Sequence, residues 1–158
     1  AAEIDAAVDA LPAAAALVTP ANKAANDGTG VVTAMVATAL TGGLTPTATL
    51  FTVTGVVNIK LFARCMVDLA GASATVAVGT ALATAGLLPL TTATTLAANE
   101  LWLDATPDTS IEAVSGLTSL LVAQDIIQTV GTAAITSGTL IYYCVWAPVS
   151  ADGAVVAA

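Results

Sequence analysis

The clearest pattern in the chain is an alternation of apolar and polar residues from Val57 to Leu69. Odd-numbered positions there are all apolar, and even-numbered positions are mostly polar, including Lys60, Arg64 and Asp68. A period of two residues predicts one long β-strand with a core face and an outer face. The three charged residues would share the outer face, close enough for weak pairing worth about 0.2–1 kcal/mol. That face is either solvated or a contact for an acidic neighbouring subunit.

Seven further segments are rich in Val, Ile, Thr or aromatic residues and are separated by turn residues. They are residues 31–37, 48–54, 75–78, 100–103, 111–114, 126–130 and 139–146. The run 140–146, Leu-Ile-Tyr-Tyr-Cys-Val-Trp, has no polar face, so we expect it at the centre of a sheet or beneath a partner. It holds half of the six aromatic residues, and a core cluster is favoured over a platform for stacking a ligand.

Two segments of the chain resemble each other. Residues 78–88 and 130–140 match at seven of eleven positions, and each consists of a strand end, a turn with glycine and a second strand. We expect two similar hairpin-like corners that face each other across two sheets. With about eight short strands and turn residues about every 8–15 positions, the sequence predicts an all-β fold, either a β-sandwich or a jelly roll.

The first 30 residues differ from the rest. Ile4, Val8 and Leu11 have helical spacing, and acidic residues lie near the start, where the helix dipole favours them. Pro12 and Pro20 limit any helix to a few turns, which is marginal in isolation. We therefore expect an N-terminal arm, with or without a short helix, over residues 1–30 and a β-sandwich domain over residues 31–158. The arm is interpreted as a docking segment.

The composition excludes several classes of function. The 158 residues include no histidine and only three cations, Lys23, Lys60 and Arg64, against eleven carboxylates, for a net charge of −8. So few cations cannot neutralise many phosphates, and we expect no direct binding to nucleic acid. Charged residues make up 9% of the chain, compared with about 25% in an ordinary soluble domain. We expect much of the surface to meet other subunits, although a weakly apolar surface of Ala, Thr and Gly is the alternative.

Three uncharged stretches, residues 28–59, 69–99 and 126–151, are long enough to cross a bilayer, which takes about 20 residues. Each is interrupted by a proline and by recurring Thr, Ser and Gly, so we expect no membrane-spanning helix. Cys65 and Cys144 have neither a CxxC spacing nor a histidine partner. Buried free thiols are favoured, and a bridge between two strands stays open.

No group of residues indicates catalysis. A Ser or Thr nucleophile needs a base, and the two lysines fall in the arm and on a strand's outer face. Four carboxylates recur at a spacing of four: Glu100, Asp104, Asp108 and Glu112. On a helix they would suit glycoside hydrolysis or a loose calcium site, but their neighbours favour a strand and then a turn at Pro107. Residues 78–81 lack the lysine of a phosphate loop. We predict a protein that is not an enzyme, with no catalytic residue, cofactor or metal.

Four stretches carry a resemblance to a known family: Leu-Phe-Thr-Val-Thr-Gly (50–55), Val-Asn-Ile-Lys-Leu-Phe (57–62), Glu-Leu-Trp-Leu-Asp-Ala-Thr-Pro (100–107) and Gly-Thr-Leu-Ile-Tyr-Tyr-Cys-Val-Trp-Ala-Pro-Val-Ser-Ala-Asp-Gly (138–153). Over about two-thirds of its length, the chain resembles small virion proteins of tailed double-stranded DNA phages, the capsid decoration or cement proteins. The resemblance implies a homotrimer near threefold axes of the outer shell that contacts the major capsid protein and staples neighbouring capsomers. It implies assembly in the host cytoplasm and no catalytic residue.

Two other assignments remain open at this stage. A pilus or fimbrial subunit shares the bias toward Ala, Thr, Val and Gly, but chaperone-assembled subunits resemble one another in a closer cysteine pair and a penultimate aromatic, whereas this chain ends Val-Val-Ala-Ala. A head fibre, tail or baseplate subunit would reuse the same fold. The net negative charge fits a solvent-facing outer surface better than one that faces packaged DNA.

Overall fold

The computed structural model describes residues 34–41, 47–109 and 116–158, and the side chains of all but the first of these ranges. They form ten β-strands and one 3₁₀ turn, η1 (Ala93–Thr95), with no α-helix in these ranges. The strands are β1 (Ala34–Thr41), β2 (Thr47–Thr54), β3 (Val56–Ala70), β4 (Thr75–Gly79), β5 (Leu88–Thr92), β6 (Leu101–Trp102), β7 (Ser119–Val122), β8 (Ile126–Gly131), β9 (Ser137–Pro148) and β10 (Ala154–Ala157). The all-β prediction is confirmed.

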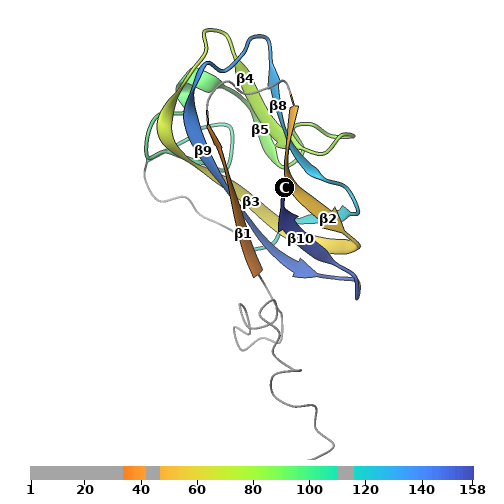
Figure 1. The fold of residues 1–158 in the computed structure, drawn as a ribbon. Coiled ribbons are helices and arrows are strands. Elements are labelled where there is room, and N and C mark those ends of the chain that lie inside the picture. The colour runs from red at the N-terminus through yellow and green to blue at the C-terminus, as the bar shows by residue number, and fades with distance from the viewer. Residues whose placement is uncertain (1–33, 42–46, 110–115) are drawn as a thin grey trace, which may run out of the picture. The chain divides into compact units, whose positions relative to one another are not determined.

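The strands form two five-stranded sheets (Figure 1). Sheet A has the order β1-β9-β3-β6, and β7 also pairs with β3. Because β9 follows β3 over most of its length, β6 and β7 lie one after the other along the opposite edge of β3. Sheet B has the order β10-β2-β8-β4-β5. Every pair with a defined register is antiparallel.

The pairs are nested along the chain. β4 pairs with β5, β3 with β6 and β7, and β2 with β8, while β1 is the neighbour of β9. Successive pairs alternate between the two sheets, which is the winding of a jelly roll. In this winding β6 and β7 share one strand position, and β10 is added beside β2. The sequence left a β-sandwich and a jelly roll open, and the strand order favours the jelly roll.

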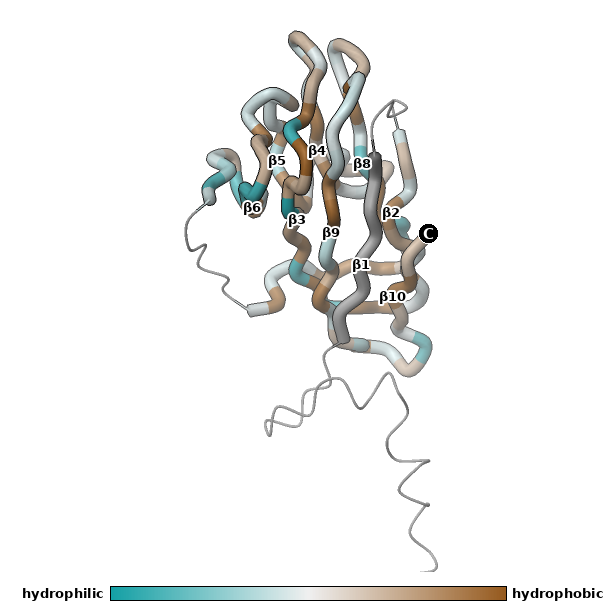
Figure 2. The backbone as a smooth tube through the Cα atoms, turned by 60° about the vertical axis from the view of Figure 1, so that its left-hand side comes forward, coloured by the Kyte–Doolittle hydropathy of each residue, from teal (hydrophilic) through white to brown (hydrophobic). Residues whose placement is uncertain are grey.

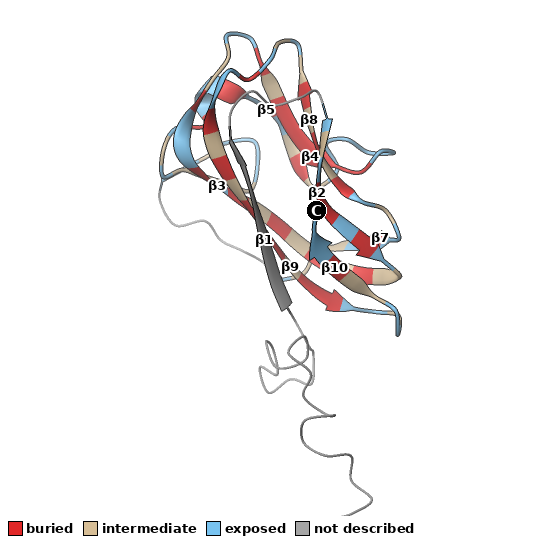
Figure 3. Ribbon diagram, viewed as in Figure 1, coloured by how far each residue is buried: buried red, intermediate tan, exposed pale blue. Residues whose placement is uncertain are grey.

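The strand predicted from alternation is β3, and every second side chain from Val57 to Cys65 points inward and is buried (Figure 3). Those side chains are Val57, Ile59, Leu61, Ala63 and Cys65. The alternation predicts that Val67 is buried too, and this is wrong, because Val67 is 54% exposed. The register with β9 shifts on both sides of Val67, so a bulge turns this side chain away from the core.

The space between the sheets contains an aromatic and polar cluster. Tyr142 of β9 and Trp102 of β6 are fully buried, with ring centroids 6.4 Å apart at an interplanar angle of 61°. The Tyr142 hydroxyl donates a hydrogen bond to Oε1 of the buried Gln128, which connects sheet A to β8 of sheet B. Burial raises the pKa of Tyr142 well above its ordinary value. The core-cluster prediction for residues 140–146 is confirmed on the face of β9 that carries Tyr142.

The prediction for run 140–146 is half confirmed. Its strand, β9, lies between β1 and β3 and is therefore central in sheet A. Burial nevertheless alternates along it, and Ile141, Tyr143 and Val145 are only half-buried (Figure 3). The second side of the strand is thus only partly covered in the described part of the chain, which leaves the alternative of further cover by a partner open.

The two similar segments have different structures. Residues 78–88 run from β4 through a turn into β5, and these two strands pair as a hairpin. Residues 130–140 leave β8 in sheet B and enter β9 in sheet A, so the second predicted hairpin is wrong. There the Thr136 amide donates to the Ala70 carbonyl oxygen at the end of β3, 2.8 Å away, which directs the chain into the other sheet.

Both cysteines are free and buried, as the sequence analysis favoured. Cys144 lies opposite Leu61, and Cys65 lies opposite Leu140. The two cysteines are therefore offset by four residues, about 13 Å along the strands, which is too far for a disulfide. Burial raises the pKa of Cys144 to about 12. The pKa of Cys65 is raised to about 11 by burial and then by the charges of Asp68 and Glu100.

Several predictions fall outside the described residues. These are the N-terminal arm over residues 1–30, its docking role, the start of the segment 31–37 and the segment 111–114. In the part of the chain that is described, no helix has the length and hydropathy needed to cross a membrane.

Candidate interaction surface

The side of sheet A that points away from the core presents a largely apolar surface. Directly opposed residues of β3 and β9 share a face, and the outward pairs are Lys60 with Val145, Phe62 with Tyr143 and Arg64 with Ile141. β6 and β7 extend the surface across the other edge of β3. We call this surface the outer face, and its members are Val56, Asn58, Lys60, Phe62, Arg64, Leu101, Leu120, Val122, Ile141, Tyr143 and Val145.

Aromatic stacking marks the centre of the outer face. The rings of Phe62 and Tyr143 are stacked, with centroids 5.1 Å apart and an interplanar angle of 16°. Toward β7, Leu120 is 65% exposed and Val122 is 57% exposed. From Val56 to Arg64 the face is about 26 Å long, and three strands make it about 15 Å wide, so it covers about 400 Å². That is the size of the largest apolar patches on monomeric proteins, which are often functional.

The expected pairing of Lys60 and Arg64 with Asp68 is wrong. Neither cation forms an ion pair within the described ranges, and the Arg64 guanidinium donates to Oδ1 of Asn99 at 3.1 Å. Asp68 instead accepts a hydrogen bond of 2.6 Å from the Ala98 amide. Residues four apart on a strand are separated by about 13 Å, and the bulge after Cys65 changes the direction of Asp68. Both cations therefore lie among apolar side chains without a carboxylate partner.

The carboxylates singled out by their spacing do not converge. Glu100 accepts a hydrogen bond of 2.8 Å from the Ala97 amide. Asp104 accepts hydrogen bonds from the amide (2.7 Å) and hydroxyl (2.9 Å) of Thr106, which lower the pKa of Asp104. Asp108 pairs through its backbone with Leu101, and Glu112 lies outside the described residues. The predicted strand and turn are thus present at β6, where hydrophilic residues gather in Figure 2.

Across the described ranges, no three His, Cys, Asp or Glu side chains come close enough together to hold a metal ion. The turn at residues 150–153 uses its carboxylate internally as well. The Ser150 hydroxyl donates to Asp152 at 2.6 Å and accepts a hydrogen bond of 2.7 Å from the Val56 amide. The first of these bonds lowers the pKa of Asp152. Glu100, Asp104 and Asp152 therefore stabilise local turns.

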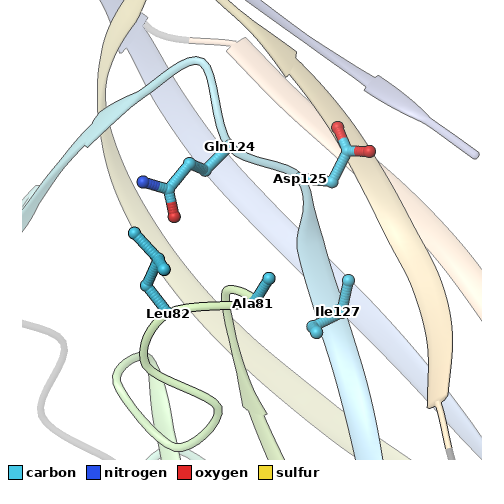
Figure 4. Close-up of a pocket in the computed structure, with 5 residues that line it drawn as sticks. All are labelled: Ala81, Leu82, Gln124, Asp125 and Ile127. Atoms are coloured by element: carbon cyan, nitrogen blue, oxygen red, sulfur yellow. The ribbon is translucent and has the colours of Figure 1, made fainter.

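An open hollow of about 490 Å³ lies between the turn after β4 and the turn before β8 (Figure 4). It is lined by Ala81, Leu82, Gln124, Asp125 and Ile127. Leu82 and Gln124 point toward each other, whereas the Asp125 carboxylate points away and accepts a hydrogen bond from the Val53 amide at 3.3 Å. The hollow thus offers a ligand one amide side chain and an apolar rim, which is little basis for specific recognition.

Sequence reasoning found only part of the outer face. It placed Lys60 and Arg64 there and counted Phe62 among the outward positions of the strand. It missed Leu120 and Val122, because the four residues of β7 show no alternation and were not predicted as a strand. It also gave no sign of the Phe62–Tyr143 stack, which depends on the register between β3 and β9.

No protein-family model and no curated protein matches the chain. A solved structure that is similar to it is described as the cyanophage Pam1 capsid asymmetric unit. The two chains are 19% identical, the match covers 75% of this chain and 84% of that chain, and the TM-score is 0.35. A TM-score this low does not establish a common fold.

Proposed function

We propose that this chain is a structural protein of a phage virion that decorates the outer capsid surface and stabilises contacts between capsomers. The observation that carries the proposal is the outer face of sheet A. It is a sheet surface of apolar and aromatic side chains at the centre of the domain, and the described part of the chain leaves it partly exposed, most of all at Leu120 and Val122. Such a patch is typical of a protein whose folded form is completed by partners.

The segments that resemble decoration proteins support the proposal by their arrangement. Three of them, residues 57–62, 100–107 and 138–153, contain parts of β3, β6 and β9. These strands are neighbours in sheet A, although the segments are far apart in sequence. Together they supply Phe62, Leu101 and Tyr143 to the outer face. The resemblance therefore concerns one continuous part of the structure that includes the candidate surface.

The physical requirements of a cement protein are compatible with this chain. Each 100 Å² of exposed apolar surface that partners cover gives a gross term of about 2.5 kcal/mol. Association costs of about 4–15 kcal/mol offset much of that gain, so attachment at several sites at once would be needed for tight binding. In the proposed arrangement the chain is a homotrimer, and its other partner is the major capsid protein. The net charge of −8 suits an outer surface away from packaged DNA.

Reconstitution on particles tests the proposal. Heads of the phage that encodes this chain, produced without it, are incubated with the purified chain, sedimented and imaged by electron cryomicroscopy. We expect the chain to co-sediment, to give density on the outer shell and to raise the temperature at which heads release DNA. Heads that already carry the chain are the control and should take up no more. Absence of binding, or density on the tail or baseplate alone, would reject a capsid role.

A further inference from the structure

We infer that the outer face of sheet A binds an acidic surface of a second copy of this chain, in a contact where the two copies use different patches. The inference rests on the homotrimer of the proposed function and names the surface through which its copies meet. The outer face supplies about 400 Å², which is about half of the roughly 800 Å² that each partner buries in a standard stable interface. The remainder would come from its rim.

Charge complementarity identifies the occupant. Lys60 and Arg64 are the cations of the described ranges, and both lie on the outer face. All other charged side chains in these ranges are carboxylates: Asp68, Glu100, Asp104, Asp108, Asp125 and Asp152. Outside its own outer face, the described part of a second copy therefore carries only negative charge. Opposite charges at an interface fix its register and accelerate association.

The same charges select the geometry of the contact. A twofold contact would place the outer face of one copy against the outer face of another. Lys60 and Arg64 of the two copies would then be brought together within an apolar surface, where like charges repel strongly. A contact between different patches avoids the repulsion, and it can close into a ring such as a trimer.

The mass of the purified full-length chain in solution, measured by sedimentation equilibrium and light scattering, tests the inference. We expect a trimer for the natural sequence at micromolar concentration, and a shift toward monomer as salt is raised. The double variant Lys60→Glu/Arg64→Glu should raise the dissociation constant of the trimer at least tenfold, and Phe62→Ser should raise it by a similar factor. Circular dichroism establishes that each variant is folded.

A matched control separates the outer face from general surface effects. Leu90→Ser removes an apolar side chain that is 61% exposed on β5 of sheet B, and it should leave the mass unchanged. A monomeric natural chain, a twofold dimer, or a trimer that survives Lys60→Glu/Arg64→Glu would overturn the inference. If a monomeric chain binds the shell, the inference about the outer face is rejected and the capsid role is supported. If the chain forms a salt-sensitive trimer that does not bind the shell, the inference is supported and the capsid role is rejected.

Discussion

The two faces of the β3–β9 pair share their backbone but differ in what covers them. On the inner face, Leu61 and Cys144 lie opposite each other and are buried between the sheets. On the outer face, the next pair along, Phe62 and Tyr143, is comparably apolar but only half-buried. Apolar character alone therefore does not assign a residue to the core of this fold. Residues on the inner face stabilise the single chain, whereas those on the outer face can contribute their full burial only when a partner covers them.

Truncating one side chain on each face is expected to give the largest contrast. Leu61→Ala leaves a cavity between the sheets and should lower the free energy of unfolding by about 2–5 kcal/mol. Phe62→Ala, one residue away, should lower it by less in dilute solution, because that ring is only half-buried. Urea denaturation at low protein concentration measures both values. Equal losses would show that the outer face is already covered within one chain.

The polar contact inside the core should give an intermediate effect. Tyr142→Phe removes the donor to Gln128 and leaves a buried amide oxygen without a partner, so we expect a loss of about 1–3 kcal/mol. The double variant Tyr142→Phe/Gln128→Leu should recover part of that loss, because both polar groups are then gone. A double-mutant cycle by urea denaturation gives the coupling energy. Additive losses would mean that the bond between the sheets contributes nothing to stability.

The buried thiols should affect stability only at high pH. Burial raises the pKa of Cys65 to about 11 and that of Cys144 to about 12, from an ordinary value of 9.0. Each folded thiol holds its proton where the unfolded thiol loses it, so stability is full below pH 9 and falls as pH rises toward 12. Urea midpoints between pH 8 and pH 11 measure this slope. Cys144→Ala should reduce the fall of stability with pH, whatever its effect on stability at pH 8. An unchanged pH dependence would contradict a raised pKa of Cys144 in the folded chain.

The sequence predicts β2, β3, β4, β6, β8 and β9 close to their observed bounds, and part of β1. β3 and β9 are long enough for their patterns to be unambiguous. β5, β7 and β10 were missed, because strands of four or five residues made of Leu, Thr, Ser, Ala and Val carry no clear period. The exposure of Val67 could not be predicted either, since a bulge is a property of pairing with β9.

The outer face could be predicted only in outline for the same reason. Alternation predicts that Lys60 and Arg64 lie on the outward side of a strand. It does not predict which strands lie beside that strand. Opposition of Phe62 to Tyr143 and of Asn58 to Leu120 follows from register, which hydrogen bonding across the sheet determines. Likewise, the sequence of residues 130–140 alone indicates a hairpin. The hydrogen bond from Thr136 to Ala70, which directs this segment into sheet A, joins segments distant in sequence and could not be predicted.

The nested order of strands has a consequence for how the chain folds. Among the strand pairs with a described register, only the β4–β5 hairpin is local, and each pair outside it joins segments that are further apart, up to the pairing of Phe51 with Ala157. Folding that begins at this hairpin would proceed outward in both directions along the chain. Strands synthesised early can complete their backbone hydrogen bonds only after the late strands have been synthesised. Rapid collapse is therefore not expected, and the newly made chain should depend on protection from aggregation until β8, β9 and β10 have emerged.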